Sequence, residues 1–186
     1  MCSSDLVLNQ VTGFVREAML IYREEAELCP EFADSLSVHL PLGVCDDMER
    51  EALEADHILA PSEFVRDTLL RLGVPAQRIA LLPYGVDSRR FHPAPPAEGA
   101  PFRVLFVGQI GQKKGIKYLL EAAGSLGLGA ENLTLAGSIV GAGGGLAAYR
   151  NHFRWVPHVP YAEVHRLYQR ADVFVFPSLH EGSAFA

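Results

Sequence analysis

The chain has 186 residues, of which 49% are hydrophobic and 20% charged, and its formal net charge is −6. This composition is typical of a folded protein and argues against a disordered one. No apolar run approaches the roughly 18 residues of a membrane span, no basic region followed by an apolar run marks a secretion signal, and no basic stripe with aromatic residues predicts binding to nucleic acid.

Cysteine and histidine usage predicts a reduced, cytoplasmic protein without a metal site. The three cysteines form no CxxC pair, and their number is odd. The seven histidines are scattered, and no pair has the helical spacing of metal ligands.

Charge and proline content divide the chain near residue 95. Sixteen acidic residues and eight arginines give residues 1–92 a net charge of −8, whereas residues 93–186 carry +2. Residues 93–101 (PAPPAEGAP) are rich in proline and are predicted to be a linker. We therefore predict one domain over residues 1–92 and a second over residues 102–186.

The first half of the chain is predicted to alternate helices with short strands. Residues 1–6 (MCSSDL) resemble a translated sequencing adapter, so we expect them to be foreign and the chain to begin in mid-protein. Apolar periodicity and turn residues give the expected elements: helices over 10–28, 31–37, 46–55 and 63–72, and strands over 57–60 and 78–82. Ser62 is expected to cap the fourth helix and Gly73 to end it. The strand, helix and strand that close this half predict a parallel sheet.

The second half repeats the alternation. The expected strands cover 102–107, 133–136, 153–156 and 172–176, and the expected helices cover 115–126, 146–152 and 161–170. Four strands with helices between them predict a doubly wound α/β sheet in the order 3-2-1-4, which binds its ligand at the switch point between strands one and four. We also expect Phe91 to pack where the chain leaves the first half, Trp155 to lie in the core, and Asp87 to brace the hinge.

A glycine loop with lysines follows the first strand of this half. The loop contains Gly108, Gly111 and Gly115. All three lysines of the sequence lie here: Lys113 and Lys114 are in the loop, and Lys117 is in the first turn of the helix. Cations at a helix N-terminus are disfavoured by roughly 0.3–1 kcal/mol each. Their position is explained either by a bound anion such as phosphate or by a solvated first turn. The glycine spacing matches neither a dinucleotide fingerprint nor a P-loop.

The loop after the fourth strand carries a carboxylate. It contains His180, Glu181, Gly182 and Ser183. In a doubly wound sheet, the loops after strands one and four are neighbours. We therefore expect the loop that bears Lys114 and the loop that bears Glu181 to face one ligand.

An ordered series of short motifs resembles family 4 glycosyltransferases, which have the GT-B fold of two Rossmann-like parallel-sheet domains. The motifs extend over roughly residues 55–186, and together they are more specific than any one alone. They are Ala55-Asp56-His57-Ile58, Pro61-Ser62, Pro83-Tyr84-Gly85-Val86-Asp87 followed by Phe91 and Pro93, Phe106-Val107-Gly108-Gln109, Lys114-Gly115, Leu135-Ala136-Gly137, residues 171–178 (ADVFVFPS) and Glu181-Gly182-Ser183.

The resemblance implies roles for individual residues. Gly108, Gln109 and Lys114 correspond to the loop that holds the donor diphosphate, although Gln109 stands where the family usually has arginine. Glu181 corresponds to the first of two motif glutamates, and the second would fall beyond residue 186. Residues expected to approach the donor sugar or phosphate are Gly137, Gly182 and Ser183, while Gly137 and His180 are also explained as ordinary loop residues.

The resemblance further implies a retaining, metal-independent glycosyltransferase of the hexosyltransferase type, with both domains incomplete and the fragment alone inactive. Its donor would be a nucleotide-diphosphate sugar and no further cofactor is implied. The acceptor would be a glycan, a lipid or a small molecule, with peripheral membrane contact through a preceding segment. Two alternatives are a nucleotide-sugar epimerase of the same build and a non-catalytic nucleotide-binding module.

Overall fold

A computed structural model describes residues 5–95 and 99–184 of the chain. Their contacts form two compact units: the first unit comprises residues 5–23, 37–85 and 180–184, and the second comprises residues 24–36, 86–95 and 99–179. Residues 24–36 thus belong to the second unit and residues 180–184 to the first. Linear boundaries at residues 92 and 102 would place each of these segments in the other unit. Residues 1–4 of the adapter-like segment and 96–98 of the proline-rich segment lie outside the described residues.

The first unit contains a three-stranded parallel sheet. Its strands β1 (Val7–Asn9), β2 (His57–Ala60) and β3 (Ile79–Leu81) lie in the order β1-β2-β3. The prediction of a parallel strand-helix-strand unit is confirmed, whereas β1 was not predicted. The unit's helical segments are the start of α1 (Val15–Leu28), α2 (Val44–Glu54), α3 (Glu63–Leu72) and the short 3₁₀ helix η2 (Ala76–Arg78).

Helix α3 has the ends that its sequence predicts. The hydroxyl oxygen of Ser62 accepts a hydrogen bond from the backbone N–H of Val65 at 3.2 Å, which satisfies one of the N–H groups exposed at a helix start. Gly73 ends the helix with a φ of 101°, a conformation that favours glycine. Between these ends, Val65 and Leu69 are fully buried against Ile58 of β2, so the apolar side of α3 covers the sheet.

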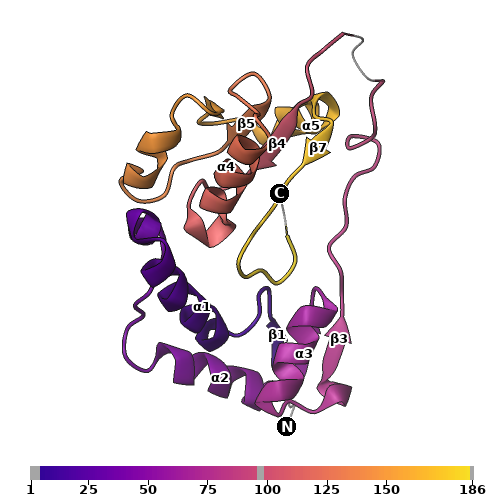
Figure 1. Cartoon of the computed structure of the whole chain (residues 1–186). Helices are drawn as coiled ribbons and strands as arrows, with labels where there is room; N and C mark the ends of the chain where they lie inside the picture. The colour runs from indigo at the N-terminus through magenta and orange to yellow at the C-terminus, as the bar shows by residue number, and fades with distance from the viewer. Residues whose placement is uncertain (1–4, 96–98, 185–186) are drawn as a thin grey trace. The chain divides into compact units, whose positions relative to one another are not determined.

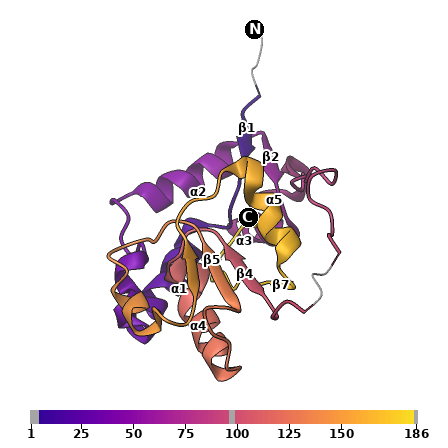
Figure 2. The same cartoon turned by 90° about the horizontal axis from the view of Figure 1, so that it is seen from above.

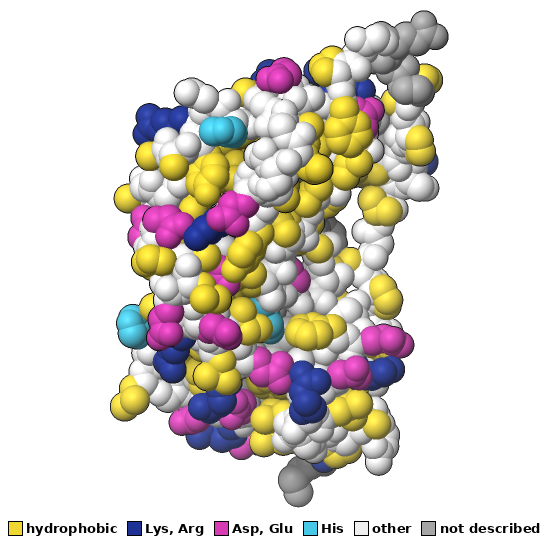
Figure 3. Space-filling model, in the orientation of Figure 1, with side chains coloured by type: hydrophobic (Ala, Val, Ile, Leu, Met, Phe, Trp, Pro, Cys, Tyr) yellow, Lys and Arg dark blue, Asp and Glu magenta, His cyan; other side chains and the backbone are white. Residues whose placement is uncertain are grey.

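Acidic and basic side chains alternate over the surface of the first unit, as Figure 3 shows. Arg16 contacts Glu49 at 2.7 Å, and Arg71 contacts Glu17 at 3.0 Å. Exposed ion pairs of this kind contribute little stability, because water and salt screen them. These acidic side chains of the first unit therefore belong to a solvated surface.

The second unit contains a four-stranded parallel sheet in the predicted order. Its strands β4 (Val104–Val107), β5 (Leu133–Ala136), β6 (Arg154–Val156) and β7 (Val173–Phe174) lie in the order β6-β5-β4-β7, which is the expected 3-2-1-4 arrangement. Figures 1 and 2 show β5, β4 and β7 side by side. The helical segments of this unit are the end of α1, η1 (Pro30–Ser35), η3 (Gln112–Lys114), α4 (Ile116–Ser125), η4 (Gly144–Tyr149) and α5 (Tyr161–Arg170).

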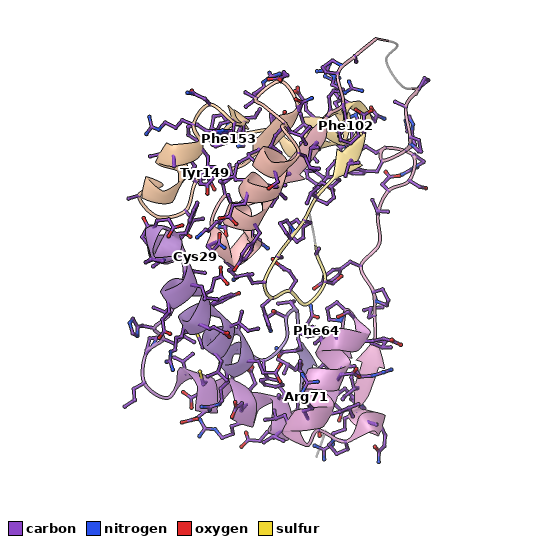
Figure 4. All side chains as sticks on the ribbon, viewed as in Figure 1. Cys29, Phe64, Arg71, Phe102, Tyr149 and Phe153 are labelled. Carbon is purple, nitrogen blue, oxygen red and sulfur yellow. The ribbon has the colours of Figure 1, made fainter. Side chains whose placement is uncertain are left out.

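The core of the second unit combines the sheet with α4 and with the segment that follows α1. Phe106 and Leu135 of the sheet and Leu120 of α4 are almost fully buried, and Cys29 and Phe32 join the same cluster. Figure 4 labels Cys29 at the end of α1, and Tyr149 and Phe153, which pack against this cluster. Apolar burial therefore fixes residues 24–36 onto the second unit.

Two expectations for this unit were wrong and one is confirmed. Trp155 is 47% exposed because it lies on the edge strand β6, and its indole N–H donates to the carbonyl of Gly137 at 2.9 Å. The helix expected over 146–152 is a 3₁₀ helix, η4, because the glycines at its start favour a turn over a regular helix. Phe91 packs edge-on against His165 and Tyr168 of α5, as expected.

Gly137 provides a test of this packing. A Cβ at Gly137, whose φ is 144°, would overlap the carbonyl oxygen of Gly108. We expect Gly137→Ala to lower the free energy of unfolding by more than about 1 kcal/mol, because backbone on both sides must shift. Gly124→Ala is the matched control: its Cβ meets no atom within 4 Å on α4, and alanine there should stabilise by about 0.4–1 kcal/mol. Denaturant unfolding of both variants measures the difference, and equal stabilities would contradict the packing.

Candidate functional site

The loops that follow β4 and β5 lie against each other. Gly108 and Gly137 occupy equivalent places after these strands, and both have φ values near 145° (145° and 144°). Beyond them the pairing continues, since Ile110 donates to the carbonyl of Ser138 at 2.8 Å and accepts from Val140 at 3.0 Å. The structure thus brings Gly108, exposed Gln109 and Gly137 together at the carboxyl end of the sheet.

Neither glycine offers its N–H group to a ligand. The N–H of Gly108 donates to the carbonyl of Ala136 at 2.9 Å, and that of Gly137 donates to Val156 at 2.9 Å. What these glycines provide is close approach of the two loops, because a Cβ at Gly137 would overlap the carbonyl oxygen of Gly108. A bound anion would therefore depend on the side chains of the neighbouring loop for its charge compensation.

The chain after β7 contacts the turn that carries the lysines. Leu179 donates its N–H to the carbonyl of Lys113 at 3.2 Å. Gly115, with a φ of 67°, faces the carbonyl of Pro177 so closely that a Cβ would overlap it. The loops after the first and fourth strands of this sheet are therefore neighbours, as a doubly wound sheet requires.

Lys114 is held over an aromatic ring. Its Nζ lies 4.9 Å from the centroid of Phe176, a cation–π arrangement. Lys114 is half-buried, while Lys113 beside it is exposed. Both lysines lie on η3, the 3₁₀ turn between Gly111 and Gly115, rather than in the first turn of α4.

Lys117 does not belong with these two lysines. Its Nζ forms an ion pair with Glu31 at 2.7 Å, and this hydrogen bond, despite an opposing effect of burial, raises the pKa of Lys117. Its backbone N–H donates to the side-chain oxygen of Gln112 at 2.9 Å. Of the two explanations offered for the lysines, a bound anion or a solvated first turn, neither describes Lys117, which pairs with a carboxylate of the chain itself.

The predicted residues of the last loop belong to the first unit. The Ser62 hydroxyl donates to the carbonyl of Gly182, and buried His180 packs edge-on against Phe64. Burial, together with the charge of Glu181, raises the pKa of Tyr22 to about 12. Glu181 and Ser183 are half-buried in this loop. That Glu181 and Lys114 share one ligand stays a prediction, since they lie in different units.

A buried polar cluster of the second unit was missed by the sequence analysis. The carboxylate of Glu25, which is 6% exposed, accepts hydrogen bonds from Gln112 at 2.7 Å, Tyr118 at 2.8 Å and Cys29 at 3.1 Å. Burial alone would raise the pKa of Glu25, but these hydrogen bonds and the charge of Lys117 outweigh it and hold that pKa below its ordinary value. Glu25 is therefore a buried, fully engaged carboxylate.

Among the described residues, no group of three or more histidine, cysteine, aspartate or glutamate side chains is arranged to hold a metal ion. Over the same residues, no helix is both long and apolar enough to cross a membrane.

Comparison with protein families gives two matches in adjoining parts of the chain. Residues 87–186 match the family described as "Glycosyl transferases group 1", and residues 44–90 match "Glycosyltransferase Family 4". A curated relative, alpha-maltose-1-phosphate synthase of Mycolicibacterium smegmatis, is 28% identical over an alignment of 158 residues. The match covers 72% of this chain and 41% of the relative.

Solved structures show the same fold. The Anabaena protein HepE, crystallised in complex with UDP and glucose, superposes with a TM-score of 0.61 at 12% identity and covers 92% of this chain and 46% of its own. Sucrose-phosphate synthase from Thermosynechococcus elongatus gives a TM-score of 0.59 at 22% identity, with 74% and 39% covered. The predicted α/β Rossmann-like GT-B fold is thus confirmed, and the chain spans less than half the length of each of these three relatives.

The lowered pKa of Glu25 predicts a pH dependence. A carboxylate whose pKa is lower in the folded state stabilises the fold above the ordinary value of 4.5, and this contribution is lost as the pH falls through the folded value. Glu25→Gln should cost about 1.5–3 kcal/mol at neutral pH, because it loses hydrogen bonds to a charged group. The Glu25→Gln variant should also lose less stability than the wild type when the pH is lowered, because the titrating carboxylate is gone.

Urea unfolding at neutral pH and below pH 4.5 measures both effects. Glu24→Gln, at the exposed neighbouring position of α1, is the matched control and should keep the wild-type pH dependence. A Glu25→Gln variant that lost as much stability on acidification as the wild type would contradict the assignment.

Proposed function

Because this chain belongs to the glycosyl transferases of group 1, we propose that it serves the retaining transfer of a sugar from a nucleotide-diphosphate sugar to an acceptor. The observation that carries the proposal is the meeting of three loops at the carboxyl end of the second sheet, with Lys113 and Lys114 on the turn between them. In doubly wound sheets, ligands bind at this place. We propose that the sugar transferred is a hexose, and we assign this activity to the whole protein rather than to these 186 residues alone.

The chemistry requires positive charge where the diphosphate departs. When the bond between the sugar C1 and the phosphate oxygen breaks, its electron pair leaves with the diphosphate. The acceptor oxygen then bonds to C1, and its proton passes to the oxygen of the departing diphosphate. Fixed cations lower the barrier by stabilising charge that develops in this step. Lys114, which the ring of Phe176 orients, is positioned to supply that charge, and Lys113 adds a second exposed cation.

The other residues of the loops have complementary roles in this proposal. Gly108 and Gly137 let the loops after β4 and β5 pack against each other, which sets the edge of the sheet on which the donor would bind. Gln109 presents an uncharged amide where arginine is usual in the family, so the diphosphate depends more strongly on the lysines. The transfer is metal-independent in this account, because the lysines replace a divalent cation, and it needs no cofactor besides the donor.

Glu181 is proposed as the catalytic carboxylate. A carboxylate beside the donor binds sugar hydroxyls and favours the oxocarbenium-like charge of the transition state. Gly182 and Ser183 would place backbone groups against the donor sugar or phosphate. This role requires Glu181 to reach the same donor as Lys114.

The nucleotide and the acceptor are proposed only as classes. HepE, one of the structural relatives, was crystallised with UDP and with UDP-glucose, so UDP is the first nucleotide to test. The acceptor is a glycan, a lipid or a small molecule. We propose that the reaction takes place in the cytoplasm, with peripheral membrane contact in the case of a lipid acceptor.

Diphosphate binding tests the proposal. We expect Lys114→Ala to raise the dissociation constant of UDP by about tenfold or more, because it removes a charge-assisted contact worth about 1.5–3 kcal/mol. Isothermal titration with UDP, ADP and GDP identifies the preferred base. Arg50→Ala on α2 is the control, since it removes one positive charge from an exposed surface and should leave binding unchanged. Equal UDP affinities for the wild type and Lys114→Ala would contradict the proposal.

Product analysis separates transfer from the epimerase alternative. With a nucleotide sugar and a pool of candidate acceptors, a retaining transferase forms a glycoside whose anomeric configuration matches that of the donor. Release of a sugar with inverted ring stereochemistry in the absence of any acceptor would instead identify an epimerase. NMR of the products distinguishes the two outcomes.

A further inference from the structure

A buried glutamine ties the lysine-bearing turn to a distant segment. Gln112 is the first residue of η3 and is 0% exposed. Its backbone N–H donates to the hydroxyl of Ser35 at 2.8 Å, and its side-chain NH₂ donates to Glu25 at 2.7 Å. Its side-chain oxygen accepts from the N–H of Lys117 at 2.9 Å. All three partners, Ser35 and Glu25 from residues 24–36 and Lys117 from the first turn of α4, belong to the second unit, as Gln112 does.

The position demands an amide. The group at residue 112 must donate to a carboxylate and accept from a backbone N–H at the same time, and among side chains of this length only glutamine does both. A leucine there would leave both partners without their hydrogen bonds, and a glutamate would place a second carboxylate against Glu25.

Glu25 is itself held from several sides. Besides Gln112, Tyr118 donates its hydroxyl to both carboxylate oxygens at 2.8 and 2.9 Å, and Cys29 donates its thiol at 3.1 Å. A carboxylate with so many donors has little freedom to move. Glu25 is therefore a fixed hydrogen-bond acceptor for the side chain of Gln112.

The opposite side of η3 is also fixed. The carbonyl of Lys113 accepts from the N–H of Leu179 in the chain after β7, and Gly111 packs closely against the side chains of Ser35 and Val140. The turn is thus held both by residues 24–36 and by the loops of the sheet. The lysine side chains at positions 113 and 114 leave from this fixed turn, the first exposed and the second half-buried.

We propose that Gln112 is a positioning residue for the diphosphate: anchored on Glu25 and Ser35, it sets the place of the turn from which Lys113 and Lys114 reach the phosphates. This assignment rests on the proposed function of the loop. It makes residues 24–36, which are remote in sequence, part of what determines donor affinity. Their contribution concerns the phosphates and leaves recognition of the nucleoside untouched.

A pair exchange tests the assignment in the whole chain. Gln112→Glu alone sets two carboxylates against each other and should raise the dissociation constant of UDP by about tenfold. Combining it with Glu25→Gln restores an amide facing a carboxylate, and the carboxylate at 112 still accepts from Lys117. We expect this exchanged pair to recover UDP affinity to within about threefold of the wild type. Binding of uridine, followed by NMR titration, should change less than about twofold in every variant.

Each other outcome decides against the assignment. A Gln112→Glu variant that unfolds more easily but binds UDP as the wild type does would show a merely structural role. If the double variant with Gln112→Glu and Glu25→Gln does not recover UDP affinity, the positioning role is likewise refuted. If Gln112→Glu does not fold, Ser35→Ala takes its place, with an expected loss of about threefold in UDP affinity, and an unchanged affinity would overturn the proposal.

The same experiment separates this inference from the function beneath it. If the wild type binds UDP, ADP and GDP no better than uridine, the proposed function falls, and the role of Gln112 falls with it. If Lys114→Ala weakens UDP binding while the Gln112 variants do not, the function stands and only the positioning role is refuted.

Discussion

The close approach of backbone to backbone at glycine is the constraint on which the second unit depends. Gly137 faces the carbonyl of Gly108, and Gly115 faces that of Pro177, at separations that leave no room for a Cβ. These contacts bring the loops after β4, β5 and β7 to one edge of the sheet. Gly108 and Gly137 both donate their N–H groups within the sheet, so neither N–H is available to a ligand. Charge for an anion must come from side chains.

In the proposed function Lys113 and Lys114 supply that charge, and a buried network fixes the turn that carries them. In the second unit, η3 is bonded to Glu25 and Ser35 through Gln112 and to the chain after β7 through Lys113. Preorganisation of this kind matters for a diphosphate, because cations that are already in place need not reorganise when negative charge develops. Lys117, in contrast, neutralises Glu31 and helps to hold the network together.

Local pattern was sufficient for much of the fold. The residues of β2, α3 and α5 form the predicted elements with the predicted bounds, because apolar periodicity, the Ser62 cap and Gly73 all act within a few residues. The strand order followed from the general rules for doubly wound sheets. Strand β1 was missed because three residues give too short a pattern. The short helix predicted over 146–152 is the 3₁₀ helix η4 over Gly144–Tyr149, which begins two residues earlier, within the glycine-rich loop.

Long-range polar contacts were beyond the reach of such reasoning. Gln112 bonds to partners 77 and 87 residues away, and nothing in its neighbourhood distinguishes a buried glutamine from an exposed one. Lys117 was grouped with its neighbours for the same reason, since its partner Glu31 is remote in sequence. The family resemblance assigns Gly108, Gln109, Lys114 and Gly137 to the donor site from ordered motifs along the chain, and that assignment stays a prediction.

The most direct test of the central claim is a crystal structure of the chain with UDP. We predict that the two phosphates lie at the carboxyl end of the sheet of the second unit, within hydrogen-bonding distance of Gln109 and of the Nζ of Lys114. Phosphates bound elsewhere, or a nucleotide held at this edge with its phosphates turned away from η3, would contradict the account.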